Sequence, residues 1–311
     1  MRGYIIDKNG NEYMLPMLHR WKINRTNGGK CDSFEASFHY SENAAELLKN
    51  AVRFYGLYEG ERVFFGVIDE FALCCSDGYE INLYGRGLGA LLMDNEAEAA
   101  EFYICSLEDI LERYVKSTGI TSVSAGGGIP PLRNFAVSSG ESCYSALLRY
   151  TEKAAGITPR FSADGTLILQ KGGESRILIN DKNPVSDVVY REKRYGRVSE
   201  AVVKTARGKK VSAADSGFIS LGGSARRITL VPIDTSDGEM RYKAQEIINS
   251  GKKGKRILEL SLSALFAAEP GDKASVRLGN LGINGDYVID ETEVWAGENS
   301  AGTKLYLEVE E

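Results

Sequence analysis

Histidine is almost absent from this chain, which has two among its 311 residues, His19 and His39. No G-x-S-x-G, P-loop or H-E-x-x-H sequence occurs either. With two histidines, few Ser/His/Asp arrangements are possible. His39 falls at an alternate, outward position of an expected strand, which favours a surface or interface histidine. The sequence therefore predicts that the chain is not an enzyme, with no catalytic residue, no cofactor and no metal ligand.

Cysteine is also scarce and without pattern. The five cysteines are scattered, odd in number and lack C-x-x-C spacing, which indicates free thiols packed as small apolar groups: Cys31, Cys74, Cys75, Cys105 and Cys143. No apolar run approaches the ~20 residues that span a bilayer, and the N-terminus shows no apolar signal segment. We therefore expect no membrane segment and folding in a cytoplasm.

An excess of positive charge is missing too. The net charge is -5 at pH 7, which argues against a general nucleic-acid binder, because such domains are usually basic. The local exception is the cationic segment KTARGKK at 204–210, followed later by Arg226 and Arg227. It is either a contact for a phosphate or an acidic partner, or a solvated loop. Without interleaved aromatic residues, recognition of a nucleic acid sequence is not expected.

Strand patterns are what the chain has in abundance, beginning with residues 1–95. Asn9-Gly10 is a hairpin signal, and SFEASFHY places alternate apolar residues on one face. A capping pattern at 43–46 predicts a helix over 44–56, and VFFGVI pairs back to YEINLY through a turn near 76–78. This order favours an antiparallel meander that closes as a small barrel.

Over residues 96–175 the strand patterns give way to helical ones, which predicts a small α+β insert of two helices and a hairpin. The segment SLED at 106–109 is a capping box before a helical pattern that stops at Gly119. A second helical pattern ends at Gly156, and an Asp-Gly turn at 164–165 predicts the hairpin.

Residues 176–311 return to strands, with a long polar loop at 204–228 and a helix over 239–250. Asn284-Gly285 supplies another hairpin signal. The strand–helix–strand order is similar on both sides of the insert. The predicted fold class is therefore β-rich α+β, with two tube-like antiparallel β-barrels, over 1–95 and 176–311, flanking the insert.

One phrase matches a nucleotide-binding motif. GRGLGA at 85–90 fits G-x-G-x-x-[GA] after a strand, and in a Rossmann unit such a loop holds a pyrophosphate at a helix N-terminus. The antiparallel meander contradicts that function, because a Rossmann unit needs parallel strands joined by a crossover helix. We interpret Gly85 and Gly87 as a bend where a strand leaves the sheet, with Arg86 paired to a local carboxylate such as Asp94.

Several segments, taken in order over most of the chain, resemble one family: FFGVIDEF, YEINLYGRGLGALLMD, LEDILERYVKSTGI, SSGESCYSALLRYTEKAAGITPRFSADGTLIL, EAVVKTARGKK and EPGDKASVRLGNLGINGDYVIDETEVW. The family is the central baseplate hub protein of contractile phage tails and tailocins, which includes the Mu-type tail protein and the hub of PBSX-like prophages. The chain is also similar to the spike-hub barrels of type VI secretion.

The resemblance implies a structural role in a virion or tail-like particle assembled in the host bacterial cytoplasm. A homotrimer would form a pseudo-sixfold ring that joins the tail tube protein above to the spike protein below, among other baseplate proteins. No LysM-like or lysozyme module accompanies it, so digestion of peptidoglycan is not expected. The structural motif residues are Gly85, Arg86, Gly87, Asp94, Pro270, Gly271 and Asp272.

Two other functions stay open. A β-rich surface or carbohydrate-binding module would expose Trp and Tyr side chains on one face, but Trp21 and Trp295 lie inside strand patterns, which favours core or interface positions. A carboxylate-dependent hydrolase would need two acidic residues at a defined separation, and nothing in the sequence singles out two.

Overall fold

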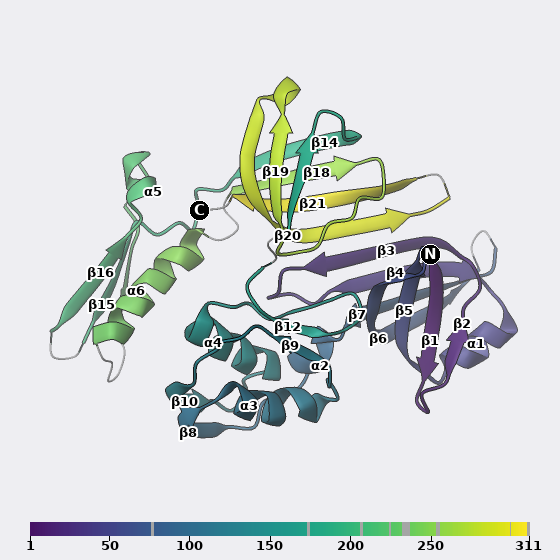
Figure 1. Cartoon of the computed structure of the whole chain (residues 1–311), viewed down its shortest axis with the longest axis horizontal. Helices are drawn as coiled ribbons and strands as arrows, with labels where there is room; N and C mark the ends of the chain where they lie inside the picture. Colours follow the sequence, from purple (N-terminus) through teal and green to yellow (C-terminus); the bar gives the residue numbers. More distant parts are fainter. Residues whose placement is uncertain are drawn as a thin grey trace. The chain divides into compact units, whose positions relative to one another are not determined.

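Two compact units make up the chain in the computed structural model, which describes residues 1–75, 78–172, 175–205, 208–223, 225–231, 237–252, 256–298 and 300–309. Unit 1 comprises Met1–Asp187 and Leu260–Tyr306, and unit 2 comprises Val188–Glu259 and Leu307–Glu311. Figure 1 shows the elements of both units. The division into three domains, at 1–95, 96–175 and 176–311, stays a prediction.

The N-terminal strands of unit 1 are all antiparallel, in the order β3-β4-β7-β6-β5-β1-β2. Their bounds are β1 Arg2–Asp7, β2 Glu12–Met14, β3 Leu18–Thr26, β4 Ser33–His39, β5 Ala51–Tyr58, β6 Glu61–Cys74 and β7 Glu80–Gly87. The predicted Asn9-Gly10 turn joins β1 to β2, with Gly10 at φ 85°. β6 pairs back to β7 as predicted, although Ser76 and Asp77 of the predicted turn lie outside the described residues.

This part of the sheet has one apolar face and one polar face. Alternate residues of β4 and β7 are buried, among them Phe34, Phe38 and Leu83, and they share a core with Trp21. Their neighbours along the strands, such as Glu35, point away from this core and are exposed or half-buried. The alternation is typical of an antiparallel sheet with one face on the core and the other in water. We call the second side the polar face.

Helix α1, Glu42–Leu48, is shorter than the helix predicted over 44–56, and that prediction is wrong in its second half. Ser41 caps the helix, because its hydroxyl accepts from the backbone N–H of Ala44 at 3.2 Å. The sequence AVRFYGLY that follows forms β5 and pairs with β1 and β6. Its β-branched and aromatic residues favour a strand, and pairing on both edges outweighs the helical spacing of its apolar residues.

Six further strands extend this sheet to 13 strands, in the order β14-β18-β21-β20-β3, with β13 paired to β19 and β19 to β20. They are β13 Arg176–Asn180, β14 Val185–Glu192, β18 Arg256–Leu262, β19 Lys273–Leu278, β20 Ile283–Ala296 and β21 Ala301–Val309. Parts of β14, β18 and β21 belong to unit 2.

Strand β20, which also neighbours β21 in the sheet, pairs with β19 and then with β3 along its length. Residues 283–288 pair with β19, and residues 291–296 pair with β3. The hairpin predicted at Asn284-Gly285 is wrong, because both residues lie inside β20. The chain turns earlier, through the 3-10 turn η3 at Gly279–Leu281, where Gly282 has φ 67° and supplies the left-handed conformation.

The remaining elements of unit 1 build a second hydrophobic core. They are α2 Gly89–Met93, β8 Ala100–Cys105, α3 Leu107–Ile110, the π-helical turn η1 Leu111–Val115, the 3-10 turn η2 Lys116–Thr118, β9 Val123–Ala125, β10 Leu132–Val137, α4 Cys143–Ala155, β11 Arg160–Phe161 and β12 Leu167–Leu169. Tyr114 and Tyr150 are almost completely buried there. The core also takes Leu92 of α2 and Val67 of β6, so it continues under the end of β7.

The helix start, helix ends and turn that the sequence predicts in this region are confirmed. Ser106 and Asp109 form the capping box of α3, with each side chain accepting from the other residue's backbone N–H. Gly119 and Gly156 end their helices in the left-handed conformation, at φ 91° and 65°. The Asp-Gly turn at 164–165 joins β11 and β12, which are antiparallel.

Unit 2 contains a three-stranded sheet and two helices: β15 Glu200–Lys204, β16 Lys210–Ala214, α5 Ser216–Ser220, β17 Arg227–Leu230 and α6 Asp237–Lys252. β15 is the central strand, and its Ala201 and Val203 pack against Met240, Ala244 and Ile248 of α6. The predicted helix over 239–250 is confirmed within α6.

The long loop predicted at 204–228 is wrong. β16 and α5 lie inside that segment and β17 begins in it, while residues 206, 207 and 224 lie outside the described residues. Pairing with the buried strand β15 outweighs the polar composition of β16. Asp215 starts α5 by accepting from the backbone N–H of Phe218 at 3.1 Å.

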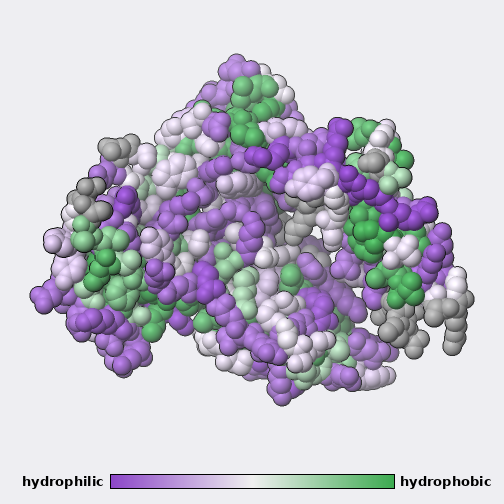
Figure 2. Space-filling model, turned by 180° about the vertical axis from the view of Figure 1, so that it is seen from behind, coloured by the Kyte–Doolittle hydropathy of each residue, from purple (hydrophilic) through white to green (hydrophobic). Residues whose placement is uncertain are grey.

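The β-rich, mostly antiparallel fold is confirmed. Among the strand pairs with a described register, the parallel ones are β9 with β12, β13 with β19 and β15 with β17. No barrel closes in the described part of the chain, so the tube-like barrels stay a prediction. All five cysteines are free thiols, as predicted. No helix of the described ranges has the length and apolar character needed to cross a membrane. Figure 2 shows small hydrophobic areas among larger hydrophilic ones on one face of the surface.

Candidate functional site

Glycines let the strands around Arg86 approach one another closely. A Cβ atom at Gly85 would lie 2.0 Å from the carbonyl oxygen of Val67, and one at Gly66 would lie 2.1 Å from that of Arg86. Only glycine fits at such distances. Both neighbours of β7 are antiparallel to it, which contradicts a dinucleotide-binding unit at GRGLGA.

Arg86 binds two carboxylates at once. Its Nε and Nη2 donate to Asp69 at 2.8 and 2.9 Å, and its Nη1 and Nη2 donate to Asp94 at 3.0 and 2.8 Å. These hydrogen bonds raise the pKa of Arg86, and the bond to Asp69 has the largest effect. The hydrogen bond from Arg86 in turn lowers the pKa of Asp94. The predicted pair with Asp94 is therefore present. The sequence did not indicate Asp69, which sits at an irregularity of β6 between Ile68 and Glu70.

Pro270-Gly271-Asp272 forms a tight turn before β19. Gly271 has φ 91°, in the left-handed region that glycine adopts without strain. Its N–H donates to the carbonyl of Ile289 at 2.7 Å, and the N–H of Ile289 donates to the carbonyl of Asp272 at 2.9 Å. A Cβ atom at Gly271 would lie 3.0 Å from Oδ1 of Asn27, which follows β3. The turn is thus fitted against the end of β3.

Charged side chains gather between these two motifs, and we call them the polar junction: Arg25, Asp32, Arg160, Glu269 and Asp272. Arg25 is 7% exposed. It donates through Nη1 to Glu269 at 2.6 Å and through Nη2 to the carbonyl of Phe161 at 3.3 Å. The Nε atoms of Arg25 and Arg160 are buried with no hydrogen-bond partner among the described residues.

Burial dominates the electrostatics of the polar junction. It raises the pKa of Asp32 to about 6, although Arg25 and hydrogen bonds from Thr26 act in the opposite direction. Burial also raises the pKa of Asp272 and lowers that of Arg160. Each charge there is costly to desolvate, so its opposite charges and hydrogen bonds offset part of that cost.

The side chains at the polar junction favour a structural role over a catalytic one. The thiol of Cys31 lies beside it and donates to the carbonyl of Gly87 at 3.4 Å. Burial raises the pKa of this thiol to about 12, so it stays protonated at neutral pH and is a poor nucleophile. Among the residues that the structure describes, no three His, Cys, Asp or Glu side chains are arranged to hold a metal ion.

The structure brings the two sequence motifs to one end of β3. Gly87 lies against Asp32, since a Cβ atom there would be 3.0 Å from that of Asp32, and Gly271 lies against Arg160 and Asn27. Sequence reasoning missed the polar junction. The available signal was the pair of charges, Arg25 and Asp32, that flanks the Asn27-Gly28-Gly29 turn between two strands.

Asp32→Asn is expected to stabilise the protein at pH 8 and to have little effect at pH 4. The folded-state pKa of about 6 lies above the ordinary 3.8, so the ionised carboxyl costs folding free energy above pH 6. That cost disappears as the pH falls through about 6 towards 3.8. Two units of pKa correspond to about 3 kcal/mol at most. Asparagine keeps the acceptor that the N–H of Thr26 uses at 2.8 Å.

Urea unfolding at several pH values measures this effect. The control is Asp187→Asn, which removes an exposed carboxylate of unit 1. We expect the difference in unfolding free energy between Asp32→Asn and the wild type to grow from pH 4 to pH 8. The same difference at every pH would show that the Asp32 carboxyl is not held in a costly ionised state.

Comparisons with known proteins bear on the fold. No family model matches the chain, and no curated protein matches it. Among solved structures it is similar to the tail protein from Neisseria meningitidis MC58, with a TM-score of 0.80 and 17% identity, covering 98% of this chain and 95% of that one. It is equally similar to the 43 kDa tail protein of prophage MuSo2 from Shewanella oneidensis, with a TM-score of 0.80, 17% identity and coverage of 99% and 98%.

A more distant likeness is to a type VI secretion system component from E. coli, itself described as structurally similar to tail proteins of bacteriophage T4. The TM-score is 0.55 at 9% identity, covering 94% of this chain and 74% of that one. At these identities the likeness concerns the fold. The resemblance stated from the sequence is confirmed at that level: over nearly its whole length, the chain has the fold of phage tail proteins.

Proposed function

We propose that this chain is a structural baseplate hub of a contractile tail or a tail-like particle. The observation that carries the proposal is the shared fold over almost the full length of two tail proteins, because the match covers 98% and 99% of this chain rather than one common module. The particle would be assembled in the cytoplasm of the bacterial host, with the chain as part of the virion or particle baseplate and no enzymatic activity.

The finer proposal is a homotrimer that forms a pseudo-sixfold ring between the tail tube protein and the spike protein. The strand order of the large sheet supports it, since that order runs from β14 at one end to β2 at the other. Open edges invite pairing unless they are covered. A ring of identical subunits uses two different surfaces at each contact, which suits a sheet with two different ends.

The sequence motifs would then have a structural role in the ring. Arg86 ties β7 to the residues after α2, and the turn at Gly271 sits against the end of β3. Both would hold the proposed insert, 96–175, in place against the strands of the first proposed barrel, 1–95. Closure of the two tube-like barrels would be completed in the assembled ring.

Light scattering on the purified protein and electron microscopy of the particle test the proposal. We expect a trimer mass in solution, and a threefold density at the junction of tube and spike that contains this chain. A chain that stays monomeric at high concentration and is missing from tail-like particles of its producer would contradict the proposal.

A further inference from the structure

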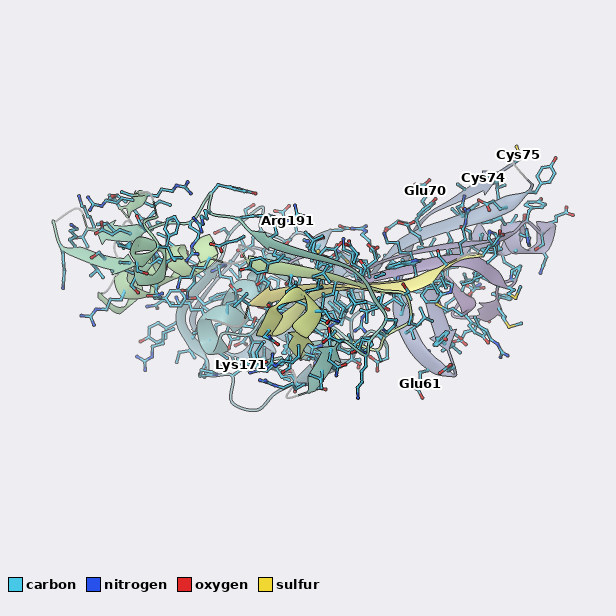
Figure 3. The ribbon with its side chains drawn as sticks, turned by 90° about the horizontal axis from the view of Figure 1, so that it is seen from above. Glu61, Glu70, Cys74, Cys75, Lys171 and Arg191 are labelled. Carbon is cyan, nitrogen blue, oxygen red and sulfur yellow. The ribbon has the colours of Figure 1, made fainter. Side chains whose placement is uncertain are left out.

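A groove of about 570 Å³ lies on the polar face of unit 1, across β20, β3, β4 and β7. Trp295, Lys22, Glu35 and Tyr84 sit in one row, because the strand registers place each of them directly opposite the next. The row continues to Glu70 of β6, opposite Tyr84. Figure 3 shows Glu70 and Cys74 projecting from the same side of the sheet.

Two aromatic rings bound this groove. The indole of Trp295 lies against the backbone of Gly302 in β21, where a Cβ atom would come 2.5 Å from its Cζ2. The missing side chain at Gly302 therefore gives the indole a place against the sheet. Tyr84, which lies three strands away from Trp295 in the row, is 38% exposed. Three strand spacings separate the two residues, which is about 14 Å.

Hydrogen-bonding groups line the groove between the two rings. Asn82 and Ser37 lie in the groove and bond to each other at 2.6 Å, while Asn82 also donates to the sulfur of Cys74 at 3.2 Å. Lys22 pairs with Glu293 at 2.9 Å. These contacts hold the polar side chains in position before any ligand arrives, which reduces the entropy lost on binding.

Charge in the groove is balanced. Its lining includes two cations, Arg20 and Lys22, and two carboxylates, Glu35 and Glu293. A polyanion such as a nucleic acid would meet as much repulsion as attraction there. A neutral ligand with many hydroxyl groups would find both donors and acceptors. The exposed ring of Tyr84 and the half-buried indole of Trp295 offer such a ligand flat apolar surface as well.

We propose that this groove binds a neutral oligosaccharide. The indole of Trp295 and the ring of Tyr84 would each stack against the apolar face of a sugar ring, and a chain of about three sugar units would bridge the roughly 14 Å between them. Glu35, Asn82 and Lys22 would bond the hydroxyl groups of the sugars between the stacked ends. The proposal does not depend on the hub function, because the groove is formed by unit 1 of a single chain.

Tryptophan fluorescence and titration calorimetry with chitotetraose and cellotetraose test this binding. The chain has two tryptophans, and both line the groove. Trp21 is 7% exposed and packs in the core, so Trp295 would be the main reporter of the ligand. We expect saturable binding of at least one of the two sugars. Trp295→Ala should weaken it by about tenfold or more and Tyr84→Ala by about threefold or more.

Tyr103→Ala is the matched control, because Tyr103 is a 75% exposed tyrosine of β8 outside the groove. It should leave the affinity unchanged. Glu35→Gln, a surface change that keeps the fold, is the second test if Trp295→Ala fails to fold, and it should also weaken binding. Absence of binding to both sugars at millimolar concentration, equal affinity in all variants, or binding of a proline-rich peptide in their place would each overturn the proposal. The trimer of the proposed hub is tested by its mass and the sugar site by binding, so one proposal can fail while the other holds.

Discussion

Arg197→Ala is expected to destabilise unit 2 by about 3–5 kcal/mol. Nη2 of Arg197 donates to Asp215 at 2.7 Å, with the two side chains 4% and 2% exposed, and the guanidinium lies 4.8 Å from the ring centre of Phe218. Burial acts to raise the pKa of Asp215, but hydrogen bonds from Arg197 and from the backbone of Phe218 outweigh it and lower that pKa. Removing Arg197 leaves a buried carboxylate without its closest cation.

Hydrogen exchange measures this loss where it occurs. Amides of β15 and α6 should lose protection in Arg197→Ala, while those of β4 and β7 in unit 1 should keep theirs. The control is Arg191→Ala, which removes a pair with Glu259 at 3.1 Å whose arginine is 51% exposed. Such an exposed pair contributes about 0–1 kcal/mol. Equal effects of the two variants would show that the buried pair does not stabilise unit 2.

Gly85→Ala is expected to destabilise unit 1 by about 3 kcal/mol or more. The added Cβ atom would lie 2.0 Å from the carbonyl oxygen of Val67 and 2.5 Å from the ring of Phe34. A backbone oxygen inside a sheet cannot rotate away as a side chain does, so β6 and β7 would have to separate. That separation would weaken the strand pairs on both sides of Gly85.

Thermal and urea unfolding check this expectation, with Gly127→Ala as the control. Gly127 lies in an exposed loop, has no atom within 4 Å of an added Cβ and has no positive φ. Its substitution should change the free energy of unfolding by less than about 0.5 kcal/mol. If Gly85→Ala unfolds at the same urea concentration as the wild type, the close approach of the strands is not what requires glycine at this position.

Sequence reasoning succeeded where structure depends on neighbours along the chain. The capping box at Ser106 and the left-handed stops at Gly119 and Gly156 are local, because each is made by residues within one helical turn. The same reasoning failed in the second half of the helix predicted over 44–56, where strand pairing decides between helix and strand. It failed again at β16, whose polar residues pair with the buried strand β15.

The candidate site shows the same limit more clearly. Arg86 and Asp94 are eight residues apart, and the pair was predicted from that short spacing. Arg25 and Glu269 are 244 residues apart, and no periodicity connects them. Asp69 contacts Arg86 at a point where the register of β6 shifts. Contacts of this kind depend on sheet register, which a single sequence does not specify over long separations.

The pairing of β3 with β20 has a consequence for synthesis of the protein. β3 leaves the ribosome among the first strands, but the strand that covers one of its edges, β20, is among the last. During most of translation that edge is therefore unpaired, while β4 covers the opposite one. Long-range pairing of this kind slows folding and leaves a partly folded chain open to aggregation. The N-terminal sheet can be completed only after β20 has emerged, so we expect a nascent chain that ends before β20 to need protection by chaperones.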